Sequence, residues 1–169
     1  MVVRRIVVVS IAVMGLAASG CTSDDPGSSE PAAGDDSSSQ SFDFGQPADV
    51  ADVDRVIDIE TSDDLAFDPE NVQVEVGEVI TFKVTNAGDL PHEFTLGPED
   101  VQQEHEDEMA EMNGMEMDGD ANAIAVPAGS TSELTWQFPE PGTVLFGCHV
   151  TGHYAAGMVG EIDVADGSA

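Results

Sequence analysis

Positive charge and cysteine are both scarce in this sequence of 169 residues. Lysine and arginine together number 4, against 34 aspartates and glutamates, so the formal net charge is −30. Binding to nucleic acid or docking on an anionic membrane surface needs clustered cations, and the composition excludes both. Two cysteines, Cys21 and Cys148, are too few for a disulfide-dense scaffold. The length fits one domain with tails, and 41% hydrophobic residues are enough for a core.

The first twenty residues have the layout of a secretory signal peptide. Arg4 and Arg5 precede an apolar run over residues 6–18, and small residues then lead to Cys21. The run is shorter than the about 20 apolar residues of a membrane span. A signal that ends on cysteine resembles a lipoprotein signal, so we expect lipidation of Cys21. The protein would then be extracytoplasmic, at the outer face of the cell membrane or in the periplasm. The alternative is an ordinary signal peptide cut nearby, which leaves Cys21 as a thiol.

Loss of residues 1–20 removes two arginines and no acid. The mature chain then keeps all 34 aspartates and glutamates, and its only lysine and arginine residues are Lys83 and Arg55. So large a negative charge repels itself at low ionic strength and is tolerated in high salt. Two explanations stay open at this point: a salt-rich source, or a cationic partner, which is either a redox protein with a basic docking surface or a metal.

Composition divides the mature chain into a tether and a domain. Residues 21–52 are rich in serine, aspartate, glycine and proline, which is typical of a disordered segment. Residues 53–165 carry short runs of alternating apolar and polar residues, for example over 72–76, 80–84, 134–138, 144–148 and 162–164. Turn residues separate these runs, so the domain is predicted to be an all-β sandwich or small barrel, followed by a tail at 166–169.

One segment inside the domain, residues 98–122, lacks strand alternation. It is acidic and contains a histidine and four methionines, and we expect a helical or partly disordered insertion. His105, Met109 and Met112 share one face of a helix that would end at Asn113-Gly114. Two interpretations stay open. In one, the methionines pack the helix against the sandwich. In the other, soft ligands of the insertion form a Cu(I) site in addition to the copper site described below: His105, Met109, Met112, Met115 and Met117.

The residues that carry chemistry lie mainly in one loop. The string Cys148-His149-Val150-Thr151-Gly152-His153-Tyr154-Ala155-Ala156-Gly157-Met158 offers a thiolate, imidazoles and a thioether between two predicted strands. Upstream, His92 adds an imidazole at the start of a strand. Two histidines and a cysteine with a weak axial methionine form the ligand set of a blue-copper site. Such a set accommodates Cu(I) and Cu(II), which suits transfer of one electron.

The domain resembles a cupredoxin of the plastocyanin/azurin family. Its C-x4-H-x4-M loop is similar in spacing to the loops of auracyanin and rusticyanin, and Phe146-Gly147 before the loop and Val159-Gly160 after it also match. The resemblance covers roughly residues 53–165 and implies a Greek-key β-sandwich. It implies one type 1 copper per chain, and it also implies a monomer. By the resemblance, His92, Cys148 and His153 are equatorial ligands and Met158 is axial.

A narrower resemblance concerns the combination of His92-Glu93-Phe94 with the acidic insertion. It is similar to secreted cupredoxins associated with copper tolerance, which implies copper handling as an alternative to electron transport. Glu93 departs from many electron-carrying relatives, which have asparagine or serine at that position. Because second-shell contacts tune a metal site, the reduction potential cannot be transferred from those relatives.

Alternative roles for His149 and Cys148 are disfavoured by the sequence. His149 could relay electrons to a second copper, but with only four histidines a solvated or hydrogen-bonded side chain is favoured. A Cys21–Cys148 disulfide would leave the ligand set incomplete and is disfavoured. Since no second metal cluster or activated nucleophile appears in the sequence, we expect an electron carrier or copper-binding protein and no enzyme.

Overall fold

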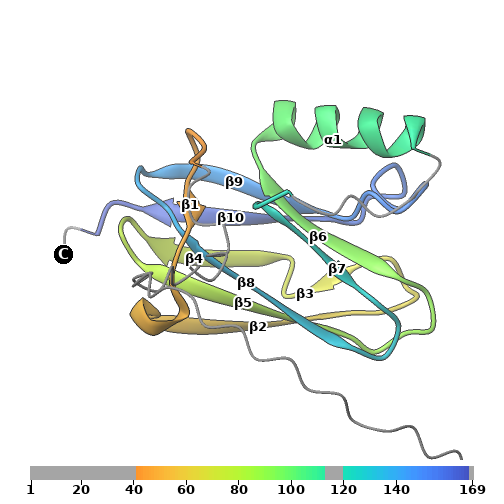
Figure 1. The fold of residues 1–169 in the computed structure, drawn as a ribbon, viewed down its shortest axis with the longest axis horizontal. Coiled ribbons are helices and arrows are strands. Elements are labelled where there is room, and N and C mark those ends of the chain that lie inside the picture. The colour runs from red at the N-terminus through yellow and green to blue at the C-terminus, as the bar shows by residue number, and fades with distance from the viewer. Residues whose placement is uncertain (1–40, 113–119, 168–169) are drawn as a thin grey trace, which may run out of the picture. The chain divides into compact units, whose positions relative to one another are not determined.

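The computed structural model describes residues 41–112 and 120–167, and in this part ten strands form two five-stranded sheets (Figure 1). The first sheet has the order β1 (Gln46–Pro47), β8 (Thr131–Gln137), β5 (Val79–Asn86), β2 (Arg55–Thr61), β3 (Phe67–Asp68). The second has the order β4 (Asn71–Glu75), β10 (Val159–Ala165), β9 (Gly142–Gly147), β6 (His92–Gly97), β7 (Ala123–Val126). The predicted all-β sandwich is confirmed.

The strands predicted from alternation correspond to β4, β5, β8, β9 and β10. In β4 the buried residues Val72 and Val74 alternate with exposed neighbours, as expected for a strand with one wet face. β5 is buried along most of its length because it lies between β8 and β2. Most pairings are antiparallel, whereas β2 with β5 and β10 with β4 are parallel.

The core contains most of the few aromatic side chains. Phe82 and Trp136 come from the first sheet, and Phe94 and Phe146 from the second, and all four are fully buried. The Phe94 ring lies 5.5 Å from that of Phe82 and 5.1 Å from that of Phe146, measured between centroids. The contact between Phe82 and Phe94 joins the two sheets directly, whereas Phe94 and Phe146 pair within the second sheet. Aromatic pairs of this kind add about 0.5–1.5 kcal/mol beyond area burial.

The structure corrects the predicted boundary between tether and domain. Residues 41–52, which we assigned to the disordered segment, contain β1 and a 3-10 helix at Val50–Asp52. The rings of Phe42 and Phe44 both lie 5.6 Å from that of Trp136. Gly45 allows this approach, because a Cβ there would lie 2.1 Å from Trp136 Nε1. Two aromatic residues in a polar segment therefore extend the packed domain to residue 42.

The insertion forms helix α1 (Glu99–Glu111), which lies alongside β6 and β9 in Figure 1. Its buried residues are Gln102, His105 and Met109, which share one face, and the predicted helix is thus confirmed. The helix ends at Glu111 with Met112 as its C-cap, whereas the expected stop at Asn113-Gly114 lies outside the described residues.

Several predictions from the sequence also fall outside the described residues. They concern the signal peptide, Cys21, the tether up to residue 40, and Met115 and Met117. Among the residues that the structure describes, no helix has the length and apolar character needed to cross a membrane.

Candidate metal centre

The start of β6 and the end of β9 bring His92 close to Cys148. The two strands are antiparallel, with Thr95 opposite Gly147, so Cys148 follows the last pair and His92 begins the neighbouring strand. The backbone N–H of Glu93 donates to Cys148 Sγ at 3.3 Å. Residues far apart in the sequence are thereby fixed by the same sheet that forms the core.

The loop 148–158 folds back on itself and returns the chain to β10. His153 N–H donates to the Val150 carbonyl at 2.8 Å, and Met158 N–H donates to the His153 carbonyl at 3.1 Å. Gly152 and Gly157 have φ values of +87° and +95°, which favour glycine. Cys148 N–H donates to the Met158 carbonyl at 3.2 Å, so the first and last residues of the loop lie side by side.

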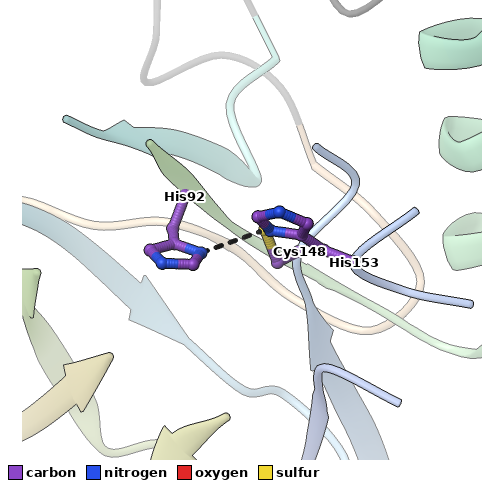
Figure 2. Close-up of side chains that lie close together, drawn as sticks. All are labelled: His92, Cys148 and His153. Carbon is purple, nitrogen blue, oxygen red and sulfur yellow. Dashed lines mark hydrogen bonds between the residues drawn. The ribbon is translucent and has the colours of Figure 1, made fainter. Parts of the chain in front are cut away.

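Three ligand atoms converge at this end of the sandwich (Figure 2). Cys148 Sγ lies 3.8 Å from His92 Nδ1 and 3.3 Å from His153 Nδ1, and the three atoms lie within 4.8 Å of one another. An ion with bonds of about 2.0–2.3 Å, the lengths known for zinc with nitrogen and sulfur, holds such neighbours about 3.4–3.8 Å apart. The observed separations therefore fit one ion bound by all three atoms.

Burial sets the protonation of these side chains. Burial lowers the pKa of His92, and the nearby His153 lowers it further, while burial lowers the pKa of His153. Both rings are therefore neutral at pH 7 and keep a lone pair for a metal. Burial raises the pKa of the Cys148 thiol to about 11, so a metal must displace its proton. Nδ1 is the ring nitrogen of His92 that faces Cys148 Sγ, which makes it the ligating atom.

Met158 is fully buried and Cys148 is a free, fully buried thiol. The four residues predicted as ligands are thus gathered at one end of the sandwich, and their donors combine soft sulfur with imidazole. This combination suits copper in both of its oxidation states.

A network of buried polar side chains joins the centre to helix α1. His105 Nε2 lies 3.1 Å from Glu93 Oε1, so the residue after ligand His92 contacts the helix. His149, which follows Cys148, places Nε2 at 2.7 Å from Gln102 Oε1 and Nδ1 at 2.8 Å from Glu106 Oε2. His149 is buried, so the expected hydrogen-bonded role is confirmed and the solvated alternative is wrong.

The pKa values of the two histidines of this network are shifted in opposite directions. Burial lowers the pKa of His149, and the hydrogen bond with Glu106 offsets only part of this effect. Burial also lowers the pKa of His105, but the hydrogen bond with Glu93 and the charges of Glu93, Asp120 and Glu108 outweigh it, and the pKa is raised. His105 therefore binds a proton more readily than an exposed histidine.

The candidate Cu(I) ligands are only partly described. Met109 is buried and Met112 half-buried. The described side chains around His105 are mainly oxygen donors, because Nε2 faces Glu93 and Nδ1 lies 3.5 Å from Asp120 Oδ2. Whether the methionines bind copper stays a prediction.

Sequence reasoning missed Gln102, Glu106 and the role of Glu93. Gln102 has the signal that could have revealed it, since it precedes His105 by three residues and Met109 by seven on the same helical face. Glu106 and Glu93 carried no comparable signal in a chain so rich in acids.

Comparison with known proteins gives the same assignment as the geometry. Residues 53–165 match the family described as copper binding proteins, plastocyanin/azurin family. The copper-resistant cuproprotein CopI of Rubrivivax gelatinosus is 38% identical over 121 residues, which cover 72% of this chain and 73% of that protein. CopI of Vibrio cholerae serotype O1 is 35% identical over 123 residues, 72% of each protein.

Solved structures of auracyanins are similar in fold to this chain. Reduced auracyanin of Roseiflexus castenholzii has a TM-score of 0.59 and 27% identity, covering 67% of this chain and 98% of that one. Auracyanin B, at 23% identity and a TM-score of 0.60, covers 72% and 96% and shares the fold. The chain therefore belongs to the plastocyanin/azurin family of copper-binding proteins, the cupredoxins, and copper is its cofactor.

Proposed function

We propose that this protein is an extracytoplasmic carrier of single electrons with one type 1 copper. His92, Cys148 and His153 would hold the ion as equatorial ligands and Met158 as the axial ligand. The observation that carries the proposal is the convergence of two neutral imidazole nitrogens on one fully buried thiol. Copper bound there would supply a one-electron couple.

The chain's own residues would keep this site nearly unchanged between oxidation states. The ligands lie at the ends of paired strands, and hydrogen bonds within the loop fix His153 and Met158. The Glu93 N–H donates to the Cys148 sulfur and stabilises its negative charge as a thiolate. Full burial of Cys148 and Met158 keeps water from the sulfur ligands. Small structural change on reduction favours fast electron transfer.

His153 is the natural point of electron exchange. It is 8% exposed, against 2% for His92 and 0% for Cys148 and Met158. Its neighbours Ala155 and Ala156 are exposed, small and uncharged in a chain that is otherwise strongly acidic. A partner could approach the ring there without displacing charged side chains. We propose a redox partner with a basic docking surface, whose association slows as added salt screens the attraction.

The site assignment is tested by copper titration of the metal-free mature protein. We expect an intense thiolate-to-copper visible band that saturates at one equivalent. Cys148→Ser should abolish the band, and Met158→Leu should keep it. Met109→Leu is the matched control, because Met109 is a buried methionine of helix α1 that is not among the predicted ligands of the type 1 copper. A Cys148→Ser protein that stays intensely blue would refute the assignment.

Copper tolerance is the second candidate, favoured by the two relatives named copper-resistant. In this case the methionines of the insertion would bind extra Cu(I). Deleting the insertion is a poor test, because Gln102 and His105 attach helix α1 to the sandwich. Replacing Met112, Met115 and Met117 by leucine removes three of the four thioethers of the insertion and leaves these contacts intact. Loss of Cu(I) beyond one equivalent would support tolerance, and unchanged uptake would exclude these methionines as the cause.

We also propose that Cys21 is lipidated and anchors the protein outside the cytoplasm. The signal-like residues 1–20 support this proposal. Cys21→Ser should move the protein from the membrane fraction to the soluble fraction. If the wild-type protein is itself found in the soluble fraction, a plain signal peptide is the better interpretation.

A further inference from the structure

A second group of metal-ligating side chains is formed by helix α1 and the segment that precedes β7. It comprises His105 and Glu108 from the helix and Asp120 from the segment before β7, and one ligand atom of each lies within 4.8 Å of the others. His105 and Glu108 are three residues apart and share a helical face. None of the three is a predicted ligand of the type 1 copper.

Glu93 fixes the orientation of the His105 ring. His105 is 5% exposed and Glu93 8% exposed, and Nε2 of the ring lies 3.1 Å from Glu93 Oε1. Because a carboxylate only accepts, the ring donates its Nε2–H to Glu93, and a cation that displaces the proton from Nδ1 would bind the lone pair of that nitrogen. Nδ1 faces Asp120 Oδ2 at 3.5 Å. Histidines that bind metals have this arrangement, in which the other ring nitrogen donates to a carboxylate.

The surroundings carry an excess of negative charge. Glu93 Oε2 is buried without a hydrogen-bond partner among the described residues, and buried unpartnered carboxylate oxygens are rare in proteins. A cavity of about 230 Å³, lined by Glu104, His105, Glu108 and Asp120 among others, opens at the same place. Since a water molecule occupies about 30 Å³, the cavity has room for a cation with part of its hydration shell.

We propose that His105, Glu108 and Asp120 bind a second cation, a divalent ion of the Cu(II) or Zn(II) class, with Glu93 as the carboxylate that orients His105. One imidazole and two carboxylates are borderline and hard donors, which suit divalent ions better than Cu(I). Cu(II) forms the most stable complexes of the first-row divalent ions with such donors. The site is therefore chemically distinct from the thioether site suggested by the methionines.

The proposal does not rest on the electron-carrier role, but the two sites are connected. Glu93 contacts both, through its side chain to His105 and through its backbone N–H to Cys148 Sγ. A cation at His105 should therefore produce a small change in the thiolate-to-copper band without removing it.

The experiment uses the full mature chain with one copper already bound. A second equivalent of Cu(II) is added and followed by electron paramagnetic resonance, which separates the narrow hyperfine splitting of a type 1 site from the wide splitting of nitrogen- and oxygen-bound Cu(II). Zn(II) competition then tests the ion class. We expect a second signal at one equivalent, with wide splitting, that excess Zn(II) displaces.

The variant Glu108→Gln/Asp120→Asn removes two ligands on exposed or half-exposed positions, so the fold is retained. Asp100→Asn/Asp107→Asn is the matched control, which removes two exposed carboxylates elsewhere on the helix. We expect binding of the second ion to weaken by at least about tenfold in the first variant only. Equal binding in both variants, or no second signal in the wild type, would overturn the proposal. The type 1 band persists in every one of these outcomes if its own ligand assignment is right, so the two proposals fail separately.

Discussion

Replacing Gln102 by alanine is expected to destabilise the metal-free protein by about 2–4 kcal/mol. Gln102 is 0% exposed, and its amide links helix α1 to both β6 and the loop of the metal centre. Nε2 donates to the Thr95 carbonyl at 2.8 Å, with longer contacts to two other carbonyls, and Oε1 lies 2.7 Å from His149 Nε2.

The magnitude follows from the two short bonds. Each contributes about 0.5–1.5 kcal/mol net, and leaving a buried polar atom such as His149 Nε2 unsatisfied costs about 1–3 kcal/mol. The sum overestimates the loss where water enters the space, so we take about 2–4 kcal/mol. A change of this size lowers the folding equilibrium constant by roughly 30- to 1,000-fold.

Equilibrium unfolding in urea measures this loss, with the fluorescence of the single tryptophan, Trp136, as the signal. With a slope of about 2 kcal/mol per molar urea, the middle of the usual range, the midpoint should fall by about 1–2 M. Gln103→Ala is the control, because Gln103 is exposed and its only side-chain hydrogen bond in the described residues, to Asp107, is 3.4 Å long. A loss below about 1 kcal/mol for Gln102→Ala, or one equal to the control, would refute the role assigned to this amide.

Three further predictions concern the metal site and the N-terminal segment. Met158→Leu should keep the visible band and raise the reduction potential, because the oxidised ion loses a weak donor; a redox titration that finds an unchanged or lower potential would contradict the axial role. Since burial raises the pKa of the Cys148 thiol to about 11, copper should displace one thiol proton at pH 7, and its apparent affinity should fall about tenfold for each unit by which the pH drops. A titration in weak buffer that detects no proton release would argue against thiolate ligation. Gly45→Ala should cost about 1–3 kcal/mol in thermal unfolding, because its Cβ would lie 2.1 Å from Trp136 Nε1; an unchanged midpoint would mean that residues 42–47 do not pack on the sandwich in solution.

The strands and the ligands could be predicted from the sequence because their signals are local. Val72 and Val74 alternate with polar residues, and Cys148, His153 and Met158 lie within eleven residues at a characteristic spacing. The helix was also predictable, since its buried residues recur on one face. Each of these patterns is formed by residues that lie close together in the sequence.

The remaining features depend on contacts between distant residues. β7 is short and reads Ala-Ile-Ala-Val, and it forms a strand because β6 pairs with it. Phe42 and Phe44 stand in a polar segment, and only the position of Trp136 explains why they pack. Helical periodicity places Gln102 on the buried face of α1, but its partners Thr95 and His149 come from other elements. Composition and periodicity do not identify such partners.

The order of the strands also has a kinetic consequence. Cys148, His153 and Met158 are close in sequence, whereas His92 joins them only when β6 pairs with β9. β9 also pairs with β10, and β10 pairs on its other side with β4. The pairing of β10 with β4 is parallel and sets Ile162 opposite Val72, two residues that are far apart in the sequence. Chains dominated by such non-local pairings fold in milliseconds to seconds. A chain that refolds in the presence of copper therefore has an incomplete ligand set until β6 has paired with β9. The rate at which the blue colour develops should then equal the rate of sandwich folding and be independent of copper concentration.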